Sequence, residues 1–242
     1  MHTLIFFSAC MSKGNSWKIL SVGGSIIIPK TGFDISFLQA FHRLIVEQIQ
    51  KGERLILSIG GGATCRQYQQ AASAVVTRSN IDLDWLGIHT TYLNAEFVRY
   101  VFQEYAYPKI IHDPTKKVQT TKKLLISAGW KPGFSTDNVA VTLAKTYGAK
   151  EVINLSNIEY VYDKDPSIYS DAKKIESIQW ATFRKNIVGN VWQPGLNLPF
   201  DPVASRSAER LGLTVKILRG TDLGEVKTAV MGQKFVGTII QP

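Results

Sequence analysis

The chain has 242 residues, enough for one large α/β domain or two small ones. It is 45% hydrophobic and 19% charged, which supports a sizeable core and excludes a disordered chain. The net charge is +9, but the basic residues are scattered, with no run beyond pairs such as Lys116-Lys117 and Lys122-Lys123. We therefore expect phosphorylated small molecules as anionic ligands, and no nucleic acid.

The two cysteines, Cys10 and Cys65, have no metal-like spacing, so the sequence predicts a cytoplasmic protein without a disulfide framework. The apolar patch Leu4 to Phe7 is too short to span a membrane, and we expect no membrane partner. We expect residues 1–17 to form a disordered extension, with a weak signal peptide as the alternative. A single domain is expected over 18–242.

A glycine pair follows the first predicted strand. Lys18 to Val22 is an apolar strand that opens into Gly23-Gly24-Ser25, and residues 26–28 are expected to stay extended until Pro29. Paired glycines let backbone N–H groups approach a ligand closely, although a simple turn would give the same pattern. Residues 33–51 have apolar positions at helical spacing.

A second glycine loop has the form of a phosphate cradle. Residues 54–59 form an apolar strand, Gly60-Gly61-Gly62 follows at once, and a helix begins near Ala63 with Arg66 one turn in. Backbone N–H groups, the helix dipole and the arginine would all attract phosphate. The pattern matches neither a Walker loop nor the dinucleotide fingerprint.

The next predicted helix spans residues 82–104 and carries Asp84 in its first turn. There the carboxylate either binds a ligand or only complements the helix dipole. Residues 109–111 and 123–127 are predicted as short strands with a polar, basic connection between them.

The most polar stretch of the chain lies between Gly129 and Pro166. Pro132 and Gly133 break the chain, residues 135–137 offer three side-chain oxygens at a helix start, and the helix stops near Gly148. Residues 151–155 are a buried parallel strand, which is followed by the polar residues Ser156, Asn157, Glu159, Tyr162, Asp163 and Asp165. Helix N-termini and strand carboxyl ends are where open α/β sheets bind anions.

The remaining chain continues the alternation of strand and helix. We expect a short strand and helix over 167–185, a flexible loop over 186–199, and a helix capped by Asp201 and closed by Gly212. A strand over 214–218, a helix over 222–231 and a strand over 236–240 complete the chain. This order predicts a three-layer αβα sandwich with a largely parallel central sheet.

Taken together, these pieces resemble the amino-acid kinase superfamily and, within it, the uridylate (UMP) kinases of the archaeal type. The resemblance rests on six segments in family order that cover nearly all of the chain from Lys18: VGGS (22–25), IGGGATCRQY (59–68), DWLGI with LNA (84–88, 93–95), GWKPGFSTD (129–137), NLSNIEYVYDKDP (154–166) and FDPVASRSAERLG (200–212).

The resemblance implies transfer of the ATP γ-phosphoryl group to UMP, giving UDP for pyrimidine nucleotide synthesis. It implies an ATP-binding part at about 151–242 and a UMP-binding part at about 18–150, magnesium held mainly by ATP phosphates, and a homohexamer. The implied catalytic residues are Gly24, Ser25, Asp137 and Asp201. The implied ATP ligands are Gly24, Ser25, Gly62, Arg66, Ser156, Asn157, Tyr162 and Asp165. The implied UMP ligands are Gly61, Asp84, Lys131, Pro132, Gly133, Phe134, Ser135, Thr136 and Asp137.

Three positions depart from the family pattern. Ser21 stands where many members have lysine, Tyr160 replaces a glycine, and Tyr92 replaces a frequent arginine. Two alternatives therefore stay open: a non-catalytic nucleotide-binding or storage relative, and a kinase for another small acid or phosphate.

Overall fold

The computed structural model describes residues 16–77, 79–189 and 198–242. Its strands are β1 (Trp17–Val22), β2 (Arg54–Ile59), β3 (Leu124–Ser127), β4 (Glu151–Ser156), β5 (Val161–Tyr162), β6 (Lys174–Ile175), β7 (Ser177–Gln179), β8 (Thr214–Arg219) and β9 (Thr238–Gln241). Its helices are α1 (Gly24–Ile27), α2 (Ile35–Gln50), α3 (Gly62–Val75), α4 (Asn80–Val101), α5 (Thr136–Tyr147), α6 (Trp180–Phe183), the π-helical turn η1 (Arg184–Val188), α7 (Pro202–Arg210) and α8 (Leu223–Val230).

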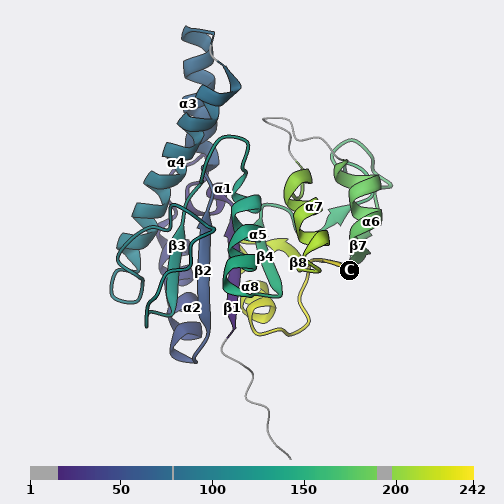
Figure 1. Ribbon diagram of the computed structural model, residues 1–242. Helices are drawn as coiled ribbons and strands as arrows, with labels where there is room; N and C mark the ends of the chain where they lie inside the picture. The colour runs from purple at the N-terminus through teal and green to yellow at the C-terminus, as the bar shows by residue number, and fades with distance from the viewer. Residues whose placement is uncertain (1–15, 78, 190–197) are drawn as a thin grey trace, which may run out of the picture.

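Seven strands form one sheet in the order β3-β2-β1-β4-β8-β9-β7 (Figure 1). The pairs β3-β2, β2-β1, β1-β4, β4-β8 and β9-β7 are parallel, and β8-β9 is antiparallel. Because the first five strands of this order run the same way, the carboxyl ends of β1, β2 and β4 meet at one edge, where open α/β sheets bind ligands. The predicted α/β class with a largely parallel sheet is confirmed.

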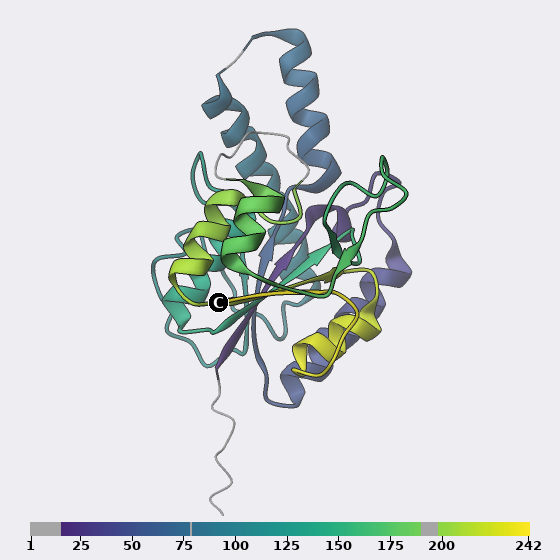
Figure 2. The same ribbon diagram turned by 90° about the vertical axis from the view of Figure 1, so that its right-hand side faces the viewer.

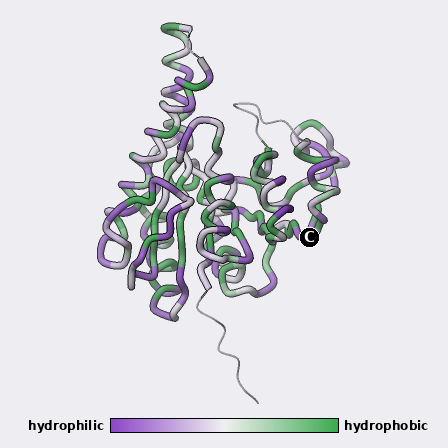
Figure 3. The backbone as a smooth tube through the Cα atoms, viewed as in Figure 1, coloured by the Kyte–Doolittle hydropathy of each residue, from purple (hydrophilic) through white to green (hydrophobic). Residues whose placement is uncertain are grey.

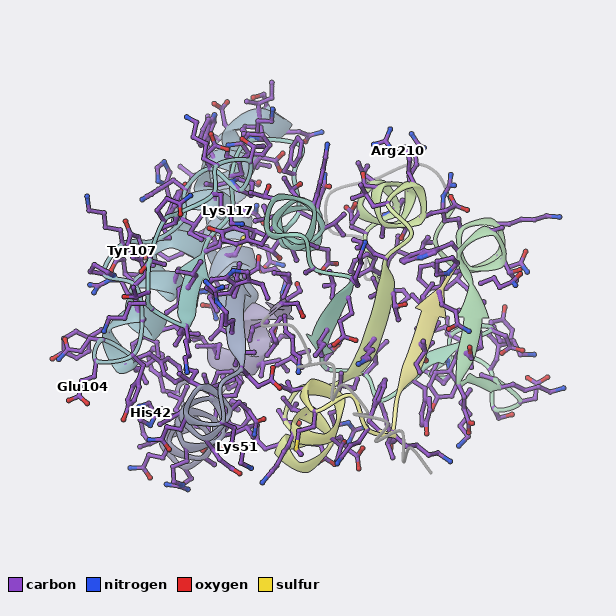
Figure 4. The ribbon with its side chains drawn as sticks, turned by 60° about the horizontal axis from the view of Figure 1, so that its bottom comes forward. His42, Lys51, Glu104, Tyr107, Lys117 and Arg210 are labelled. Atoms are coloured by element: carbon purple, nitrogen blue, oxygen red, sulfur yellow. The ribbon has the colours of Figure 1, made fainter. Side chains whose placement is uncertain are left out.

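Two buried clusters on opposite faces of the sheet give the fold its three layers. Along β1, Leu20 belongs to the cluster that packs against α2, α4 and α8, and Ile19 belongs to the one that packs against α5 and α7. Figure 4 shows this arrangement from below, with α5 and α7 on one side of the strands and α2 and α8 on the other. His42 and Lys51 mark the α2 side there, and Arg210 marks α7. The alternation of strand side chains thus places each apolar residue in one of the two cores.

The α3–α4 pair extends beyond the body of the molecule, as two views at right angles show (Figures 1 and 2). Hydrophobic residues recur along it up to its tip (Figure 3). Ser79 caps α4 through a capping box with Asp82, so the helix begins two residues earlier than predicted. Asp84 consequently lies in the second turn of α4, and the first-turn position that we expected for it is wrong.

Several predicted local structures are corrected. Residues 24–27 form the helical turn α1, so the extended conformation expected for 26–28 is wrong. The strand expected over residues 109–111 is wrong: the chain from Ala106 to Ile111 runs along the edge of β3 and pairs with it only through two isolated parallel bridges, Ala106 to Leu124 and Ile111 to Ser127. Ile110 and Ile111 are buried there. Residues 186–188 belong to η1 and not to a loop, while 190–197 of that predicted loop lie outside the described residues.

The two ends of the predicted domain differ slightly from expectation. Trp17 belongs to β1, so the strand begins one residue earlier than predicted, and residues 1–15 of the expected extension lie outside the described residues. At the other end β9 spans Thr238–Gln241 and runs antiparallel to β8. In the described part of the chain, no helix is both long and apolar enough to cross a membrane.

Candidate active site

A cavity of about 600 Å³ opens where β1 and β4 end. It is lined by Ser21, Gly23, Ser25, Ile26, Lys30, Arg66, Gln69, Thr136, Asp137, Asn154, Leu155, Ser156, Asn157, Leu198 and Pro199. These residues come from the strand ends, α1, α3, the start of α5 and the segment before α7. The volume is within the range of sites that hold small ligands.

The two glycine loops contact each other through their backbones beside this cavity. A Cβ added at Gly24 would lie 2.1 Å from the backbone nitrogen of Gly62, and one added at Gly62 would lie 2.5 Å from the carbonyl carbon of Gly24. Gly62 also has a φ of +66°, which glycine adopts without strain. Asn94 of α4 fixes the second loop, since its amide donates to the carbonyls of Gly60 at 2.8 Å and Gly61 at 3.1 Å. The two glycine loops therefore meet at one place.

Asp137 is the only acid among the residues that line the cavity. Ser135 caps α5 by accepting from the Asn138 N–H, which places Asp137 in the first helical turn. Its Oδ1 accepts hydrogen bonds from the Ser21 hydroxyl at 2.9 Å and the Asn154 amide at 3.3 Å. Burial, opposed by the Ser21 hydrogen bond, raises the pKa of Asp137 to about 6, and the nearby carboxylate of Asp201 adds to the increase.

Asp201 is a second buried carboxylate beside the first. It caps α7 by accepting from the Ala204 N–H at 2.6 Å, with Pro202 at the first helical position, as predicted. Its own N–H donates to Asp137 Oδ2 at 3.4 Å. Burial raises the pKa of Asp201 as well. Within the described ranges, neither carboxylate has a salt bridge to a lysine or arginine.

The cavity has two cations on its wall. Arg66 of α3 donates to the Ser25 hydroxyl at 3.0 Å, so the predicted phosphate cradle holds its arginine next to the first glycine loop. Lys30, which follows α1, also lines the cavity, and the sequence interpretation did not assign it a role. In the sequence, the only signal for a role of Lys30 is that it follows the Gly24-Ser25 pair by five residues. The cavity thus places positive charge on one side and Asp137 on another.

Asp84 lies in a group of residues next to this cavity. Its Oδ2 accepts from the backbone N–H of Gly133 at 2.8 Å, which ties α4 to the loop before α5. In that loop the Lys131 amine sits over the Trp130 ring at 4.2 Å and the Phe134 ring at 4.9 Å. The sequence left open whether the Asp84 carboxylate only complements the dipole of its helix. Its hydrogen bond to Gly133 shows that it also orders the loop before α5. Gly61, Asp84 and residues 131–135 do not line the 600 Å³ cavity themselves, whereas Thr136 and Asp137 do.

The residues predicted for adenosine divide into two groups. Ser156 and Asn157 line the cavity. Tyr162 and Asp165 do not; Tyr162 is in the β5–β6 hairpin, and Asp165 accepts hydrogen bonds from the backbone and hydroxyl of Ser167, which lower its pKa. Tyr160 has no positive φ, since among the described residues only glycines do, so its replacement of glycine causes no backbone strain. Its ring lies 4.7 Å from the Lys174 amine.

Ser21 and Lys18 point to opposite faces of β1. The Lys18 amine forms an ion pair with Glu53 at 2.7 Å and donates to the Val230 carbonyl at 2.6 Å, on the side away from Asp137. Lys18 therefore cannot replace a lysine at position 21. Tyr92 packs against His112, with ring centroids 4.8 Å apart, and burial raises its pKa.

These features together define an α/β protein with a strand-end cavity suited to a phosphate-bearing ligand: two cations and Asp137 line it, and the glycine loops and Asp201 lie beside it. The chain belongs to the amino acid kinase family, whose model matches residues 16–219. The resemblance to this family and its fold is therefore confirmed.

Relatives with assigned names are similar over nearly the whole chain. The uridylate kinase of Methanospirillum hungatei is 31% identical over 224 residues, which cover 92% of this chain and 93% of that protein. The uridylate kinase of Hyperthermus butylicus is 29% identical and covers 92% and 96%. The crystal structure of uridylate kinase from Archaeoglobus fulgidus matches with a TM-score of 0.78 and 26% identity over 92% of this chain and 99% of that one. A UMP kinase structure from Bacillus anthracis, at 16% identity and a TM-score of 0.76, shares the fold.

Proposed function

We propose that this protein is a UMP kinase that transfers the γ-phosphoryl group of ATP to UMP. The bond between the γ-phosphorus and the β–γ bridging oxygen breaks, a bond to a UMP phosphate oxygen forms, and ADP leaves with the electron pair. The attacking phosphate is largely ionised at neutral pH, since its second pKa is near 6, so no general base is needed. The site has only to align the two nucleotides and stabilise charge.

The observation that carries this proposal is the backbone contact of Gly24 with Gly62 beside Asp137. It brings two phosphate-binding loops together at one point, as a head-to-head transfer requires. ATP would lie in the cavity, with its phosphates near Ser25 and Arg66 and its nucleoside near Ser156 and Asn157. UMP would lie towards Asp84 and the 131–135 loop. The assignment of the two nucleotides to residues 151–242 and 18–150 is part of the proposal.

Asp137 and Asp201 fit a divalent cation that arrives with ATP. Two adjacent buried carboxylates with raised pKa values and no salt bridge in the described chain favour a positive charge beside them. Mg²⁺ is usually bound by one or two carboxylates together with substrate phosphates and water. Among the described residues no cluster of three or more metal-binding side chains occurs. We propose that Mg²⁺ supplies charge neutralisation and that these two side chains face it.

One side of α4 carries an exposed apolar stripe, in which Ile81, Leu93 and Tyr100 are 61%, 64% and 69% exposed. Such a stripe supports association with further copies of the chain, and we propose the homohexamer that the family resemblance implies. We place the protein in the cytoplasm, in the pathway that makes pyrimidine nucleotides.

The test is product formation from ATP with each common nucleoside monophosphate in turn, with Mg²⁺ present. UDP formation with UMP as the preferred acceptor is expected. Tight ATP binding without turnover on any acceptor would favour a nucleotide-binding or storage relative, for which the exchange of lysine for Ser21 is the specific argument. Turnover only with another small acid or phosphate would assign a different substrate to the same site.

A further inference from the structure

Five unpaired basic side chains gather at the end of the sheet opposite the cavity. In the parallel register, Trp17 at the start of β1 lies beside Arg54 of β2. Leu55 pairs with Leu124, so Lys123, the residue before β3, is at the level of Arg54. Val152 pairs with Ile19, which puts Lys150 at the same level on β4. Lys145 is in the last turn of α5, two residues before Tyr147, at the end of the helix that leads to Lys150. We call the set of Arg54, Lys117, Lys123, Lys145 and Lys150 the basic edge.

Contacts with a buried aromatic pair hold the centre of the basic edge in place. The Arg54 guanidinium lies 4.1 Å from the ring centre of Trp17, and the Lys117 amine lies 5.9 Å from that of Tyr147. The two rings pack edge to face at 5.3 Å, and the Tyr147 hydroxyl accepts from the Val118 N–H at 2.9 Å. Figure 4, in which this end of the sheet comes forward, shows Lys117 beside α5. The packed pair of Trp17 and Tyr147 thus brings Arg54 of β2 and Lys117, which are distant in sequence, to the same part of the surface.

The charge of the basic edge is not compensated within the described part of the chain. None of its five members forms a salt bridge there, whereas the neighbouring cations do: Lys18 with Glu53, Lys116 with Asp113, and Lys216 with Glu151. Five unpaired cations make up more than half of the net charge of +9. The sequence does not reveal this concentration, because the five residues belong to three separate stretches: residue 54, residues 117–123 and residues 145–150.

Nucleotide binding in the cavity cannot account for this charge. Ser21, which contacts Asp137, is four residues beyond Trp17, a distance of about 13 Å along β1. The fully buried Ile19 lies between the two levels. A phosphate held by Arg66 and Ser25 is therefore separated from the basic edge by the packed core of the sheet.

In contrast to the sequence-based expectation of no nucleic acid, we propose that the basic edge binds the phosphate backbone of a nucleic acid strand without reading its sequence. Adjacent strands of a sheet are about 4.8 Å apart, so Lys123 and Arg54 are neighbours and Lys150 is two strands from Arg54, with Trp17 of β1 between them. The three side chains form a row across four strands that a polyanion can follow. The aromatic rings beneath the row are buried, at 4% exposed for Trp17 and 6% for Tyr147, so they are not available for stacking on bases. Charge without base contacts gives sequence-independent binding.

Two other polyanionic partners fit less well. None of the exposed large apolar residues of the described chain belongs to the basic edge or adjoins it in sequence, so nothing there would insert into an anionic membrane. An acidic protein would be expected to meet an apolar anchor in addition to charge, and the exposed large apolar residues of the described chain offer none within the basic edge.

Fluorescence anisotropy with labelled single-stranded RNA and DNA 20-mers of mixed sequence tests the proposal. Excess UMP and ADP keep the cavity occupied during the titration. The variant Lys117→Gln/Lys123→Gln/Lys150→Gln is compared with Lys185→Gln/Arg210→Gln/Lys234→Gln, which removes three charges from other exposed positions. Lys150→Glu alone, at an exposed residue outside the strands, serves if the first variant fails to fold.

At about 50 mM salt, wild type and the second variant should bind the 20-mers, and the basic-edge variant should bind at least about tenfold more weakly. The slope of log affinity against log salt should become shallower by about 2, because each phosphate that is no longer neutralised reduces it by about 0.7. The proposal is overturned if wild type does not bind, if both variants bind equally weakly, or if wild type binds only phosphatidylserine vesicles or polyglutamate.

Discussion

The Ser21 hydroxyl donates to the carboxylate of Asp137 at 2.9 Å, across the gap between β1 and the first turn of α5. The family resemblance leads one to expect lysine at position 21, whose charge would stabilise the Asp137 carboxylate far more than a hydroxyl does. With serine there, burial dominates, and the pKa of Asp137 rises to about 6. At neutral pH most Asp137 side chains are therefore already ionised, and an arriving cation or cation–nucleotide complex would favour the ionised form further.

Asp137→Asn should lower turnover by orders of magnitude while leaving the fold intact. The amide keeps the size and can still accept from Ser21 and Asn154, but it cannot carry the charge that faces the transferring group. Steady-state UDP formation and a thermal melt measure the two effects. A near-normal rate would remove Asp137 from the catalytic residues, and Asp171→Asn, at an exposed aspartate outside the cavity, is the control.

The stability of the ligand-free protein should fall as pH rises from about 4 to 6 through the contribution of Asp137. Its folded pKa of about 6 lies above the unfolded value of 3.8, so the folded state binds more protons in this window and loses that advantage as pH increases. The contribution is at most about 3 kcal/mol, from about 1.4 kcal/mol per pKa unit. Urea unfolding at several pH values measures it, and Asp137→Asn should lose this component. Equal pH profiles for both proteins would contradict the assigned pKa.

Lys30→Ala should raise the KM for ATP by roughly three- to tenfold, because an exposed cation near phosphate contributes about 1 kcal/mol. Lys30→Arg should retain most of the affinity, since it keeps the charge. Lys185→Ala removes an exposed lysine elsewhere and should have no effect. Calorimetry with ATP and with AMP separates the phosphates from the nucleoside: only the affinity for ATP should fall. Equal decreases for both ligands would argue against a contact with the terminal phosphates.

Gly24→Ala should destabilise the protein by about 1–3 kcal/mol, because its methyl group would lie 2.1 Å from the backbone of Gly62 and the two loops must separate. Turnover should fall with it. Gly224→Ala is the control: its methyl group would meet no backbone atom, only the capping oxygen Asp222 Oδ1 at 3.3 Å, within a helix that alanine favours. Denaturant midpoints compare the two. If Gly24→Ala were as stable as wild type and fully active, the close contact of the loops would not matter for the site.

Asp84→Ala should weaken UMP binding by about tenfold or more and leave ATP binding unchanged. The substitution removes a ligand for the acceptor nucleotide and also the acceptor for the Gly133 N–H, so the 131–135 loop loses its tie to α4. Asp84→Asn retains an oxygen for Gly133 and should be milder. Titrations of each nucleotide measure both affinities. Unchanged UMP affinity in Asp84→Ala would restrict Asp84 to a structural role.

Local patterns predicted much of the fold, because glycine loops, caps and apolar runs act over short distances. Ser135 and Asp201 cap the helices assigned to them, and Gly148 ends α5 with a φ of +71°. The errors arose where contacts between distant segments determine the local backbone structure. An apolar run such as 26–28 is compatible with either a strand or a helical turn, and only the contact with the second glycine loop places residues 24–27 in α1.

The site could be predicted only as far as its segments could be recognised. Arg66 and Asp137, both assigned to the site from the sequence, line one cavity, and Asp201 lies beside Asp137; their roles stay predictions. Lys30 and Gln69 were missed, because a cavity wall is made by the approach of distant segments, which a linear pattern does not record. The same reason explains the basic edge, whose members are neighbours only through the way the strands and α5 pack together.

The most direct test of the central claim is a crystal structure with UMP, Mg²⁺ and a non-hydrolysable ATP analogue bound together. We predict the γ-phosphate of the analogue between Gly24-Ser25 and Gly62, facing the UMP phosphate, with Asp137 and Asp201 towards the metal ion. If the two nucleotides occupied separate places with their phosphates apart, or if either bound away from the glycine loops, the proposed transfer would be contradicted.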